Sequence, residues 1–301
     1  MAEPGIVLGA NQYGKAEVRL VRVDRDGPRH SITDLDVTSQ LRGDFTAAHT
    51  EGDNARIVAT DTQKNTVFAF ARGGVGAPEE FLLRLGRHFT GEFEWVTGGR
   101  WEAEQYTWNR IPVDGAPHDH SFVRGGTEIR TAVVTFVGAE ATVISGLRDL
   151  AVLKSAGSKF HGFVRDRYTT LAETDDRILA TSVTARWRYR GVDVDVDFDE
   201  AFADVRRLLL EAFAQTHSLA LQQTLYEMGR RVLEARTEID EIRFSMPNLH
   251  HFAVDLTPFG LDNPNEVFFA ADRPYGLIEA TVLREGVTGD HPAWHGIAGF
   301  C

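Results

Sequence analysis

The chain contains two adjacent histidines, His250 and His251, whose imidazole rings could act as an acid or a base. They stand in the stretch SMPNLHHFAVDLTPFG, residues 245–260, just before an alternation of apolar and polar residues. Because neighbouring side chains of a strand point to opposite faces, His250 is expected on the apolar face with Phe252, and His251 on the other face with Asp255. The pattern alone favours a partly buried structural histidine, with a catalytic base as the alternative.

A second pair of histidines, His118 and His120 in PHDHSF, has a spacing that occurs among metal ligands. The chain offers no second cluster of ligands, and its single cysteine, Cys301, rules out a cysteine-based zinc site and an internal disulfide. Neither a GxGxxG after a strand nor a P-loop is found. The sequence thus shows no motif for a metal or an organic cofactor, and we expect a structural role for this pair.

The charge balance narrows the class of partner. Acidic residues outnumber basic ones by 44 to 32, which gives a formal net charge of -12. Binding to phosphate backbones relies on basic surface, so the composition argues against a nucleic-acid partner, although a small anion responds to local charge. No segment approaches 18 uninterrupted apolar residues, and the N-terminal residues lack a signal-peptide pattern. We expect no membrane partner and a cytoplasmic location.

The first half of the chain shows strands, then two helices, then strands. Strand formers dominate residues 5–25, and residues 31–41 follow as the expected hairpin partner. A helix is predicted over 60–74, with Thr60 as its N-cap and Gly73 as its stop, and a second over 77–89, with Pro78 near its start. Further strands are expected at residues 104–113, 120–126 and 128–147.

The second half repeats this order. Residues 177–198 alternate as a strand would, most plainly at Val192, Val194 and Val196. A helix is predicted over 199–215 and another from about Ser218, where Leu221, Leu225, Met228 and Val232 form one apolar stripe. Strands are expected at 239–256 and 266–283. The chain, of 301 residues with 43% hydrophobic, is therefore predicted to be α+β, with two tandem ββααββ units, each an antiparallel sheet with its helix pair on one face.

Five motifs resemble those of the urate oxidase (uricase) family. They are YGK at 13–15, IVATDTQKNT at 57–66, GFVRDRYTTLAETDDRIL at 162–179, LQQTLYEM at 221–228 and PNLHHF at 247–252. The resemblance covers residues from about 8 to 285. It implies the tunnelling fold (T-fold), with one unit over 8–140, a second over 141–285 and a C-terminal tail over 286–301. In this fold, antiparallel sheets close into a barrel on oligomerisation, and two barrels stack as a homotetramer with active sites at subunit interfaces.

The reaction implied by the resemblance is cofactor-free oxidation of urate by dioxygen and water to 5-hydroxyisourate and hydrogen peroxide. Urate is a flat, anionic purine, so its site needs a stacking face, a cation and a fixed amide. Phe160 resembles the stacking ring, Arg177 the planar fork that holds one edge, and Gln222 the amide at the opposite edge. Without the resemblance, Phe160 would be interpreted as a core residue, Arg177 as a surface residue in an ion pair, and Gln222 as an ordinary residue in the first turn of a helix.

The resemblance also assigns roles to the other site residues. Lys15 resembles the catalytic lysine, which can take a proton near neutral pH only if its surroundings lower its pKa. Lys15 would contact the substrate through the hydroxyl of Thr60. Thr60 lies at a helix N-terminus, whose unpaired N–H groups favour binding of an anion. His250 matches the histidine after PN, whereas His251 has no matching role. The full expectation is Lys15, Thr60 and His250 as catalytic, and Thr60, Asp61, Phe160, Leu171, Arg177, Leu221, Gln222 and Asn248 as substrate-binding.

Two other functions stay open at this level: a T-fold hydrolase acting on a pterin or purine, often with zinc, and a purine-binding protein without turnover. Leu249 departs from the more usual basic or polar residue of the family's motif, and is expected to point out of the site. Peroxisomal members of the family end in a Ser-Lys-Leu-like tripeptide, whereas this chain ends in AGFC. A bacterial-type cytoplasmic enzyme is therefore expected.

Overall fold

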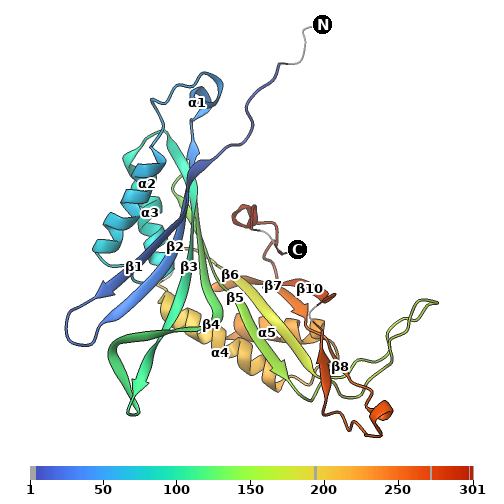
Figure 1. The fold of residues 1–301 in the computed structure, drawn as a ribbon. Coiled ribbons are helices and arrows are strands. Elements are labelled where there is room, and N and C mark those ends of the chain that lie inside the picture. Colours follow the sequence, from blue (N-terminus) through green and yellow to red (C-terminus); the bar gives the residue numbers. More distant parts are fainter. Residues whose placement is uncertain (1–4, 193–194, 272, 298, 301) are drawn as a thin grey trace. The chain divides into compact units, whose positions relative to one another are not determined.

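The computed structural model of the chain describes residues 5–192, 195–271, 273–297 and 299–300. It divides into two compact units, Met1–Ser145 with Gly191–Phe198, and Gly146–Arg190 with Asp199–Cys301. Each unit contains the predicted order of strands and helices (Figure 1). The strand pairs with a recorded register are antiparallel, as predicted. The unit bounds of 8–140 and 141–285 stay a prediction.

The first unit is a sheet with the strand order β1-β2-β3-β4 and two helices packed on it. Its elements are β1 Tyr13–Asp24, β2 Ser31–Gly43, α1 Thr46–Thr50, α2 Thr60–Arg72, α3 Pro78–Glu92, β3 Val96–Val113 and β4 Ala116–Val137. Helix α3 buries Phe81, Leu82, Leu85 and Phe89 because they lie on one stripe. Gly86 allows the close approach to the sheet, since a Cβ there would lie 2.2 Å from the ring of Phe136.

A charged pair lies in the core of the first unit. Glu79, in the first turn of α3, is fully buried and accepts hydrogen bonds from Arg130 at 2.8 Å and from Ser145 at 2.5 Å. Arg130 also donates to the carbonyl of Phe198 at 3.1 Å. Burial raises the pKa of Glu79, while Arg130 and Ser145 oppose that shift. Burial therefore disfavours the charged form of Glu79, and these two partners favour it.

Replacing Arg130 with methionine is expected to lower the free energy of unfolding by about 3–5 kcal/mol, because it leaves the carboxyl of Glu79 buried without its cation. The double variant Glu79→Leu/Arg130→Met should recover much of that loss, because neither charge is then buried alone. Urea unfolding at pH 7 followed by circular dichroism measures both. A loss below about 1 kcal/mol for Arg130→Met would show that the pair does not hold the core.

The second unit has the same arrangement around strands β6, β7 and β10. Strand β5, Glu140–Lys154, begins in the first unit and continues in the second. The remaining elements are β6 Leu179–Tyr189, α4 Phe198–Gln215, α5 Leu221–Ala235, β7 Ile239–Asn248, β8 His251–Ala253, a short helical turn Thr257–Phe259, β9 Phe268–Ala270, β10 Gly276–Leu283 and a second turn Pro292–Trp294. Leu221, Leu225, Met228 and Val232 are buried, which confirms the predicted stripe of α5.

Several local predictions of strand and helix bounds were wrong. Strand β1 starts at Tyr13 rather than near residue 5. The N-cap of α2 is Ala59, and Thr60 is the first helical residue. Strand β6 ends at Tyr189, so the alternation at Val192 and Val196 does not form a strand; neither valine is fully buried, and Val194 lies outside the described residues. The segment 239–256 is two strands, because Leu249 and His250 interrupt it.

The C-terminal tail packs on the sheet of the second unit. The ring of Trp294 is buried, and the guanidinium of Arg243, on β7, lies 4.2 Å from its centroid. Arg243 also donates to the carbonyl of Gly289. The tail therefore covers a charged part of β7 within its own chain. In the described part of the chain, no helix combines the length and apolar character needed to cross a bilayer.

Candidate active site

Five of the predicted site residues line one cavity of about 500 Å³ in the second unit. They are Phe160, Leu171, Arg177, Asn248 and His250. The cavity lies between the segment that connects β5 to β6 and the end of β7 with the β8–β9 pair. Two stretches of the chain that are far apart in sequence thus contribute to one pocket.

The segment before β6 is held in a fixed shape by its own backbone. Phe160 and Thr174 exchange two backbone hydrogen bonds, of 3.0 and 3.2 Å, and the N–H of Arg177 donates to the carbonyl of Ser158 at 3.0 Å. Gly157 permits the turn at its start, since its φ is +74° and its N–H donates to the carboxylate of Asp176 at 2.9 Å. These bonds place Phe160 and Arg177 next to each other.

Arg177 and Phe160 lie beside each other in the lining of the cavity. The guanidinium carbon of Arg177 lies 4.9 Å from the centroid of the Phe160 ring, and its Nε donates to the hydroxyl of Ser158 at 3.3 Å. Burial lowers the pKa of Arg177, but an arginine stays charged at neutral pH. A flat anion stacked on the ring could therefore also meet a cation that donates in the plane of its edge.

Phe163 is a residue of this site that the sequence analysis missed. Its ring stacks on that of Phe160, with centroids 5.0 Å apart and an interplanar angle of 15°. Such a contact restricts the orientation of the Phe160 ring. The spacing of the two phenylalanines in SKFHGF was the only signal available, and it does not distinguish a stacking partner from a surface residue.

Asn248 and His250 come from the end of β7. Asn248 pairs with Thr181 of β6 and Gly276 of β10, so it is fixed on both sides. The backbone carbonyl of His250 accepts a hydrogen bond from Ala271 at 2.9 Å, and its ring stacks near Phe252 at 5.7 Å. His250 and Phe252 are therefore neighbours, as predicted, although Phe252 is half exposed rather than on a buried apolar face.

His250 is electrostatically coupled to the arginine. Burial, followed by the charge of Arg177 and then by His251, lowers the pKa of His250 below its ordinary value of 6.5. The neutral imidazole is therefore the form present at neutral pH. Because the unfolded chain binds this proton more readily, this group reduces the free energy of unfolding as pH falls below 6.5.

We expect the pKa of His250 to rise when Arg177 is replaced by glutamine, because the second-largest cause of its lowering is removed. It should still stay below 6.5, since burial remains. Titration of the His250 ring by NMR measures both values. Arg165→Gln, which removes an exposed arginine of the same segment, is the matched control and should leave the titration unchanged. An unaltered pKa in Arg177→Gln would show that the two side chains are not coupled.

A second group of predicted residues lies together in the first unit. The hydroxyl of Tyr13 accepts a hydrogen bond from the N–H of Val58 at 2.8 Å, which ties the start of β1 to the start of α2. Lys15 pairs in register with Ser39, whose hydroxyl donates to Gln63 of α2 at 3.0 Å. These contacts bring Lys15 to the N-terminus of α2, where Thr60 and Asp61 are exposed.

The electrostatics agree with this placement. Lys64 donates to the carboxylate of Asp61 and is the main cause that lowers the pKa of Asp61, and the charge of Lys15 adds a smaller effect in the same direction. Lys15 is therefore close enough for its charge to act at the helix N-terminus. The predicted first-unit residues Lys15, Thr60 and Asp61 do not line the cavity around Arg177.

Leu221 and Gln222 begin α5 in the second unit. Leu221 is buried and Gln222 is exposed, and neither lines the cavity. His118 and His120 contact each other on β4, with ring centroids 4.5 Å apart, and His30 lies beside His120 at 5.8 Å. Among the residues that the structure describes, no group of three or more side chains has the arrangement of a metal site.

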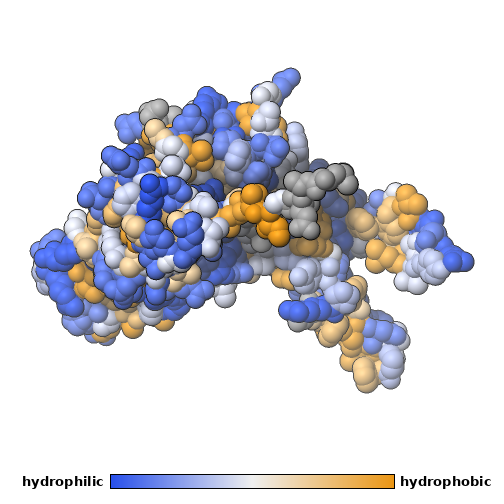
Figure 2. Space-filling view, turned by 90° about the horizontal axis from the view of Figure 1, so that it is seen from above, coloured by the Kyte–Doolittle hydropathy of each residue, from blue (hydrophilic) through white to orange (hydrophobic). Residues whose placement is uncertain are grey.

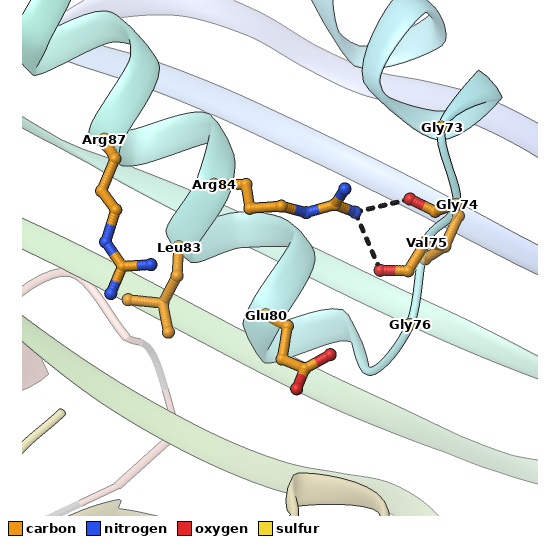
Figure 3. Close-up of a pocket in the computed structure, with 8 residues that line it drawn as sticks. All are labelled: Gly73, Gly74, Val75, Gly76, Glu80, Leu83, Arg84 and Arg87. Atoms are coloured by element: carbon orange, nitrogen blue, oxygen red, sulfur yellow. Dashed lines mark hydrogen bonds between the residues drawn. The ribbon is translucent and has the colours of Figure 1, made fainter. Parts of the chain in front are cut away.

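A shallower cavity in the first unit has a structural explanation. It is lined by the turn between α2 and α3, with Glu80, Leu83, Arg84 and Arg87 (Figure 3). Arg84 donates to the carbonyls of Gly74 and Val75 at 2.5 and 3.0 Å. The guanidinium thus fastens the turn between the two helices, and this cavity is not the site of the predicted residues.

The fold and the cavity define a class of protein: an α+β chain of ββααββ units with an arginine beside an aromatic ring, suited to a flat anionic ligand. A family model described as Uricase matches residues 11–135 and 143–279. The chain is 67% identical to the uricase of Arthrobacter globiformis over 98% of this chain and 96% of that protein, and 38% identical to that of Dictyostelium discoideum over 91% and 96%. The chain belongs to the uricase family.

Solved structures agree with this assignment. The crystal structure of uricase from Arthrobacter globiformis superposes with a TM-score of 0.92 at 67% identity, and the match covers 97% of this chain and 99% of that one. Urate oxidase from Bacillus sp. TB-90 superposes with a TM-score of 0.81 at 25% identity, over 91% of this chain and 100% of that one. The predicted α+β T-fold is thereby confirmed.

Proposed function

We propose that the chain oxidises urate with dioxygen and water to 5-hydroxyisourate and hydrogen peroxide, without a cofactor. The observation that carries this proposal is the cavity in which Arg177 lies beside the ring of Phe160, in a chain of the uricase family. The relatives named above are uricases over nearly the full length of this chain. A hydrolase that uses zinc finds no support from the geometry: the cavity is lined by His250 and His251 and by the carboxylates of Glu173 and Asp176, but among the described residues no three such side chains are arranged as a metal site.

Substrate recognition would use three contacts with different chemistry. The urate ring stacks on Phe160, and Arg177 donates from its planar fork to one edge of the ring. Gln222 offers both a donor and an acceptor to the opposite edge, Leu171 supplies apolar contact, and Leu221 precedes Gln222 at the start of α5. This arrangement fixes the ring in position and in rotation, which a single charged contact could not do.

Proton removal would come from the first-unit group. Lys15 takes a proton through the hydroxyl of Thr60, and the backbone N–H groups of Thr60 and Asp61, at the N-terminus of α2, stabilise negative charge on the ring. The deprotonated ring is electron-rich enough to transfer an electron to dioxygen directly. Asn248 and neutral His250 then hold dioxygen, and afterwards the attacking water, above the ring.

The site would be shared between two copies of the chain in a homotetramer. The first-unit and second-unit residues form two groups, and the cavity is lined only by members of the second group, without Leu221 and Gln222. Large apolar side chains are exposed on the two segments that contribute to that cavity, the connection from β5 to β6 and the region of β8 and β9. Figure 2 shows hydrophobic surface on both. The exposed side chains include Val164, Tyr168, Phe252, Phe259 and Phe269. Exposed apolar groups of this kind indicate a surface that another chain covers.

Protein treated with a strong chelator is expected to consume urate at the rate of untreated protein, with one hydrogen peroxide formed per urate, because no step above uses a metal or an organic redox group. Loss of the ultraviolet band of urate, together with a peroxide assay, measures both quantities. Activity lost on chelation and restored by one metal would assign a role to His118 and His120. Binding of urate without turnover would instead identify a purine-binding protein.

A further inference from the structure

Three buried hydroxyl residues, Ser158, Ser218 and Thr224, connect Arg177 to the first turn of α5 through side-chain and backbone hydrogen bonds. Ser158 is fully buried; its carbonyl accepts the N–H of Arg177 at 3.0 Å, and its hydroxyl accepts the Nε–H at 3.3 Å. Ser158 therefore holds both the backbone and the side chain of this arginine. Among the described residues, no acceptor is recorded for the two terminal nitrogens of Arg177, which leaves them as the pair that can meet a ligand.

Ser158 forms an isolated parallel bridge with Ser218. The N–H of Ser218 donates to the carbonyl of Gly157 at 2.9 Å, and the carbonyl of Ser218 accepts from Lys159 at 2.7 Å. Ser218 is also fully buried, so these bonds are shielded from water. The position of Ser158 is thereby fixed relative to the residues that precede α5.

The link continues into the helix. The hydroxyl of Thr224, fully buried in the first turn of α5, donates to the hydroxyl of Ser218 at 2.7 Å, and that hydroxyl donates to the carbonyl of Ala220 at 3.1 Å. Thr224 has one weaker alternative acceptor, the carbonyl of Ala220 at 3.4 Å. The N-cap of α5 is Ala220, which has no side chain that could cap the helix. The hydroxyls of Ser218 and Thr224 therefore hold the turn that carries Gln222.

We infer that Ser158, Ser218 and Thr224 are positioning residues: Ser158 fixes the guanidinium of Arg177, and Ser218 and Thr224 fix the first turn of α5, which carries Gln222, relative to it. The inference rests on the proposed binding of urate by Arg177 and Gln222. Because Ser158 engages the Nε–H, the guanidinium is held in one orientation before the ligand arrives. Binding then requires little ordering of a long side chain, which would otherwise weaken the affinity.

The test is the dissociation constant of urate, measured by calorimetric titration under argon so that no oxidation occurs. Ser158→Ala should weaken binding about tenfold, as expected for a lost hydrogen bond to a charged group. Thr224→Val, which has nearly the same shape but no hydroxyl, should weaken binding several-fold, and Thr224→Ser should bind within about twofold of the unaltered protein. Ser145→Ala, which removes a buried hydroxyl in the first unit, is the matched control for stability and should leave the affinity unchanged.

A double-variant cycle separates positioning from general stability. In the Arg177→Lys background no Nε–H remains for Ser158 to hold, so adding Ser158→Ala should change the affinity less than twofold. An equal loss in both backgrounds, or full affinity in Ser158→Ala, would overturn the inference. If Ser158→Ala does not fold, the Thr224→Val and Thr224→Ser pair decides: equal affinities would overturn it. Failure of the unaltered protein to bind urate would instead contradict the proposed function.

Discussion

Replacement of Arg177 by lysine is expected to lower kcat/KM for urate at least about a hundredfold, although the positive charge is retained. Lysine has no planar pair of donors, and its ammonium group cannot also bond Ser158 as the Nε of arginine does at 3.3 Å. The substrate would keep an attractive charge but lose its fixed rotation, which the reaction needs. Steady-state kinetics on folded protein, checked by circular dichroism, measure the loss.

Arg165→Lys provides the matched control for this change. Arg165 is exposed on the same segment, and its guanidinium lies 5.1 Å from the ring of Phe163 rather than beside Phe160. Its replacement should change kcat/KM less than threefold, because it has no contact with the proposed substrate. An Arg177→Lys protein with unchanged kcat/KM would contradict the edge-binding role of the arginine.

Two inactive variants are expected to regain activity when they are refolded together. A Thr60→Ala chain loses the first-unit group, and an Arg177→Lys chain loses the second-unit group, so each alone should be nearly inactive. If a site takes one group from each of two chains, random pairing in a mixture makes about a quarter of the sites whole. Activity of the refolded mixture, relative to refolded unaltered protein, measures this fraction.

Each parent refolded alone, at the same total concentration, is the control for this mixture. Size-exclusion chromatography establishes that the mixture has assembled as the unaltered protein does. A mixture that assembles but stays as inactive as its parents would place both groups in one chain, and the shared site would then be wrong.

Secondary structure was predictable where the sequence pattern and the packing agree. Helix α5 has an apolar stripe at helical spacing, and those residues are buried against the sheet. The alternation at Val192 and Val196 failed because a strand also needs a partner strand, and β6 ends at Tyr189 before that stretch. An alternating pattern reports that residues could form a strand, whereas pairing decides whether they do.

The candidate site was predictable in its residue types but not in its supporting contacts. The family resemblance identified Phe160, Arg177 and His250, and the structure brings these three into one cavity. Ser158 and Phe163 were missed because a buried hydroxyl or a stacked ring acquires its role from a contact across the fold. Whether Lys15 and Thr60 complete the same site stays a prediction.

The most direct measurement of the central claim is a crystal structure of the protein with urate, grown and cooled without dioxygen. The account predicts urate stacked on Phe160, with the terminal nitrogens of Arg177 at one edge of the ring and Gln222 at the other. Thr60 of a second copy of the chain should contact the same ring. Urate bound outside this cavity, or enclosed by residues of one chain alone, would contradict the account.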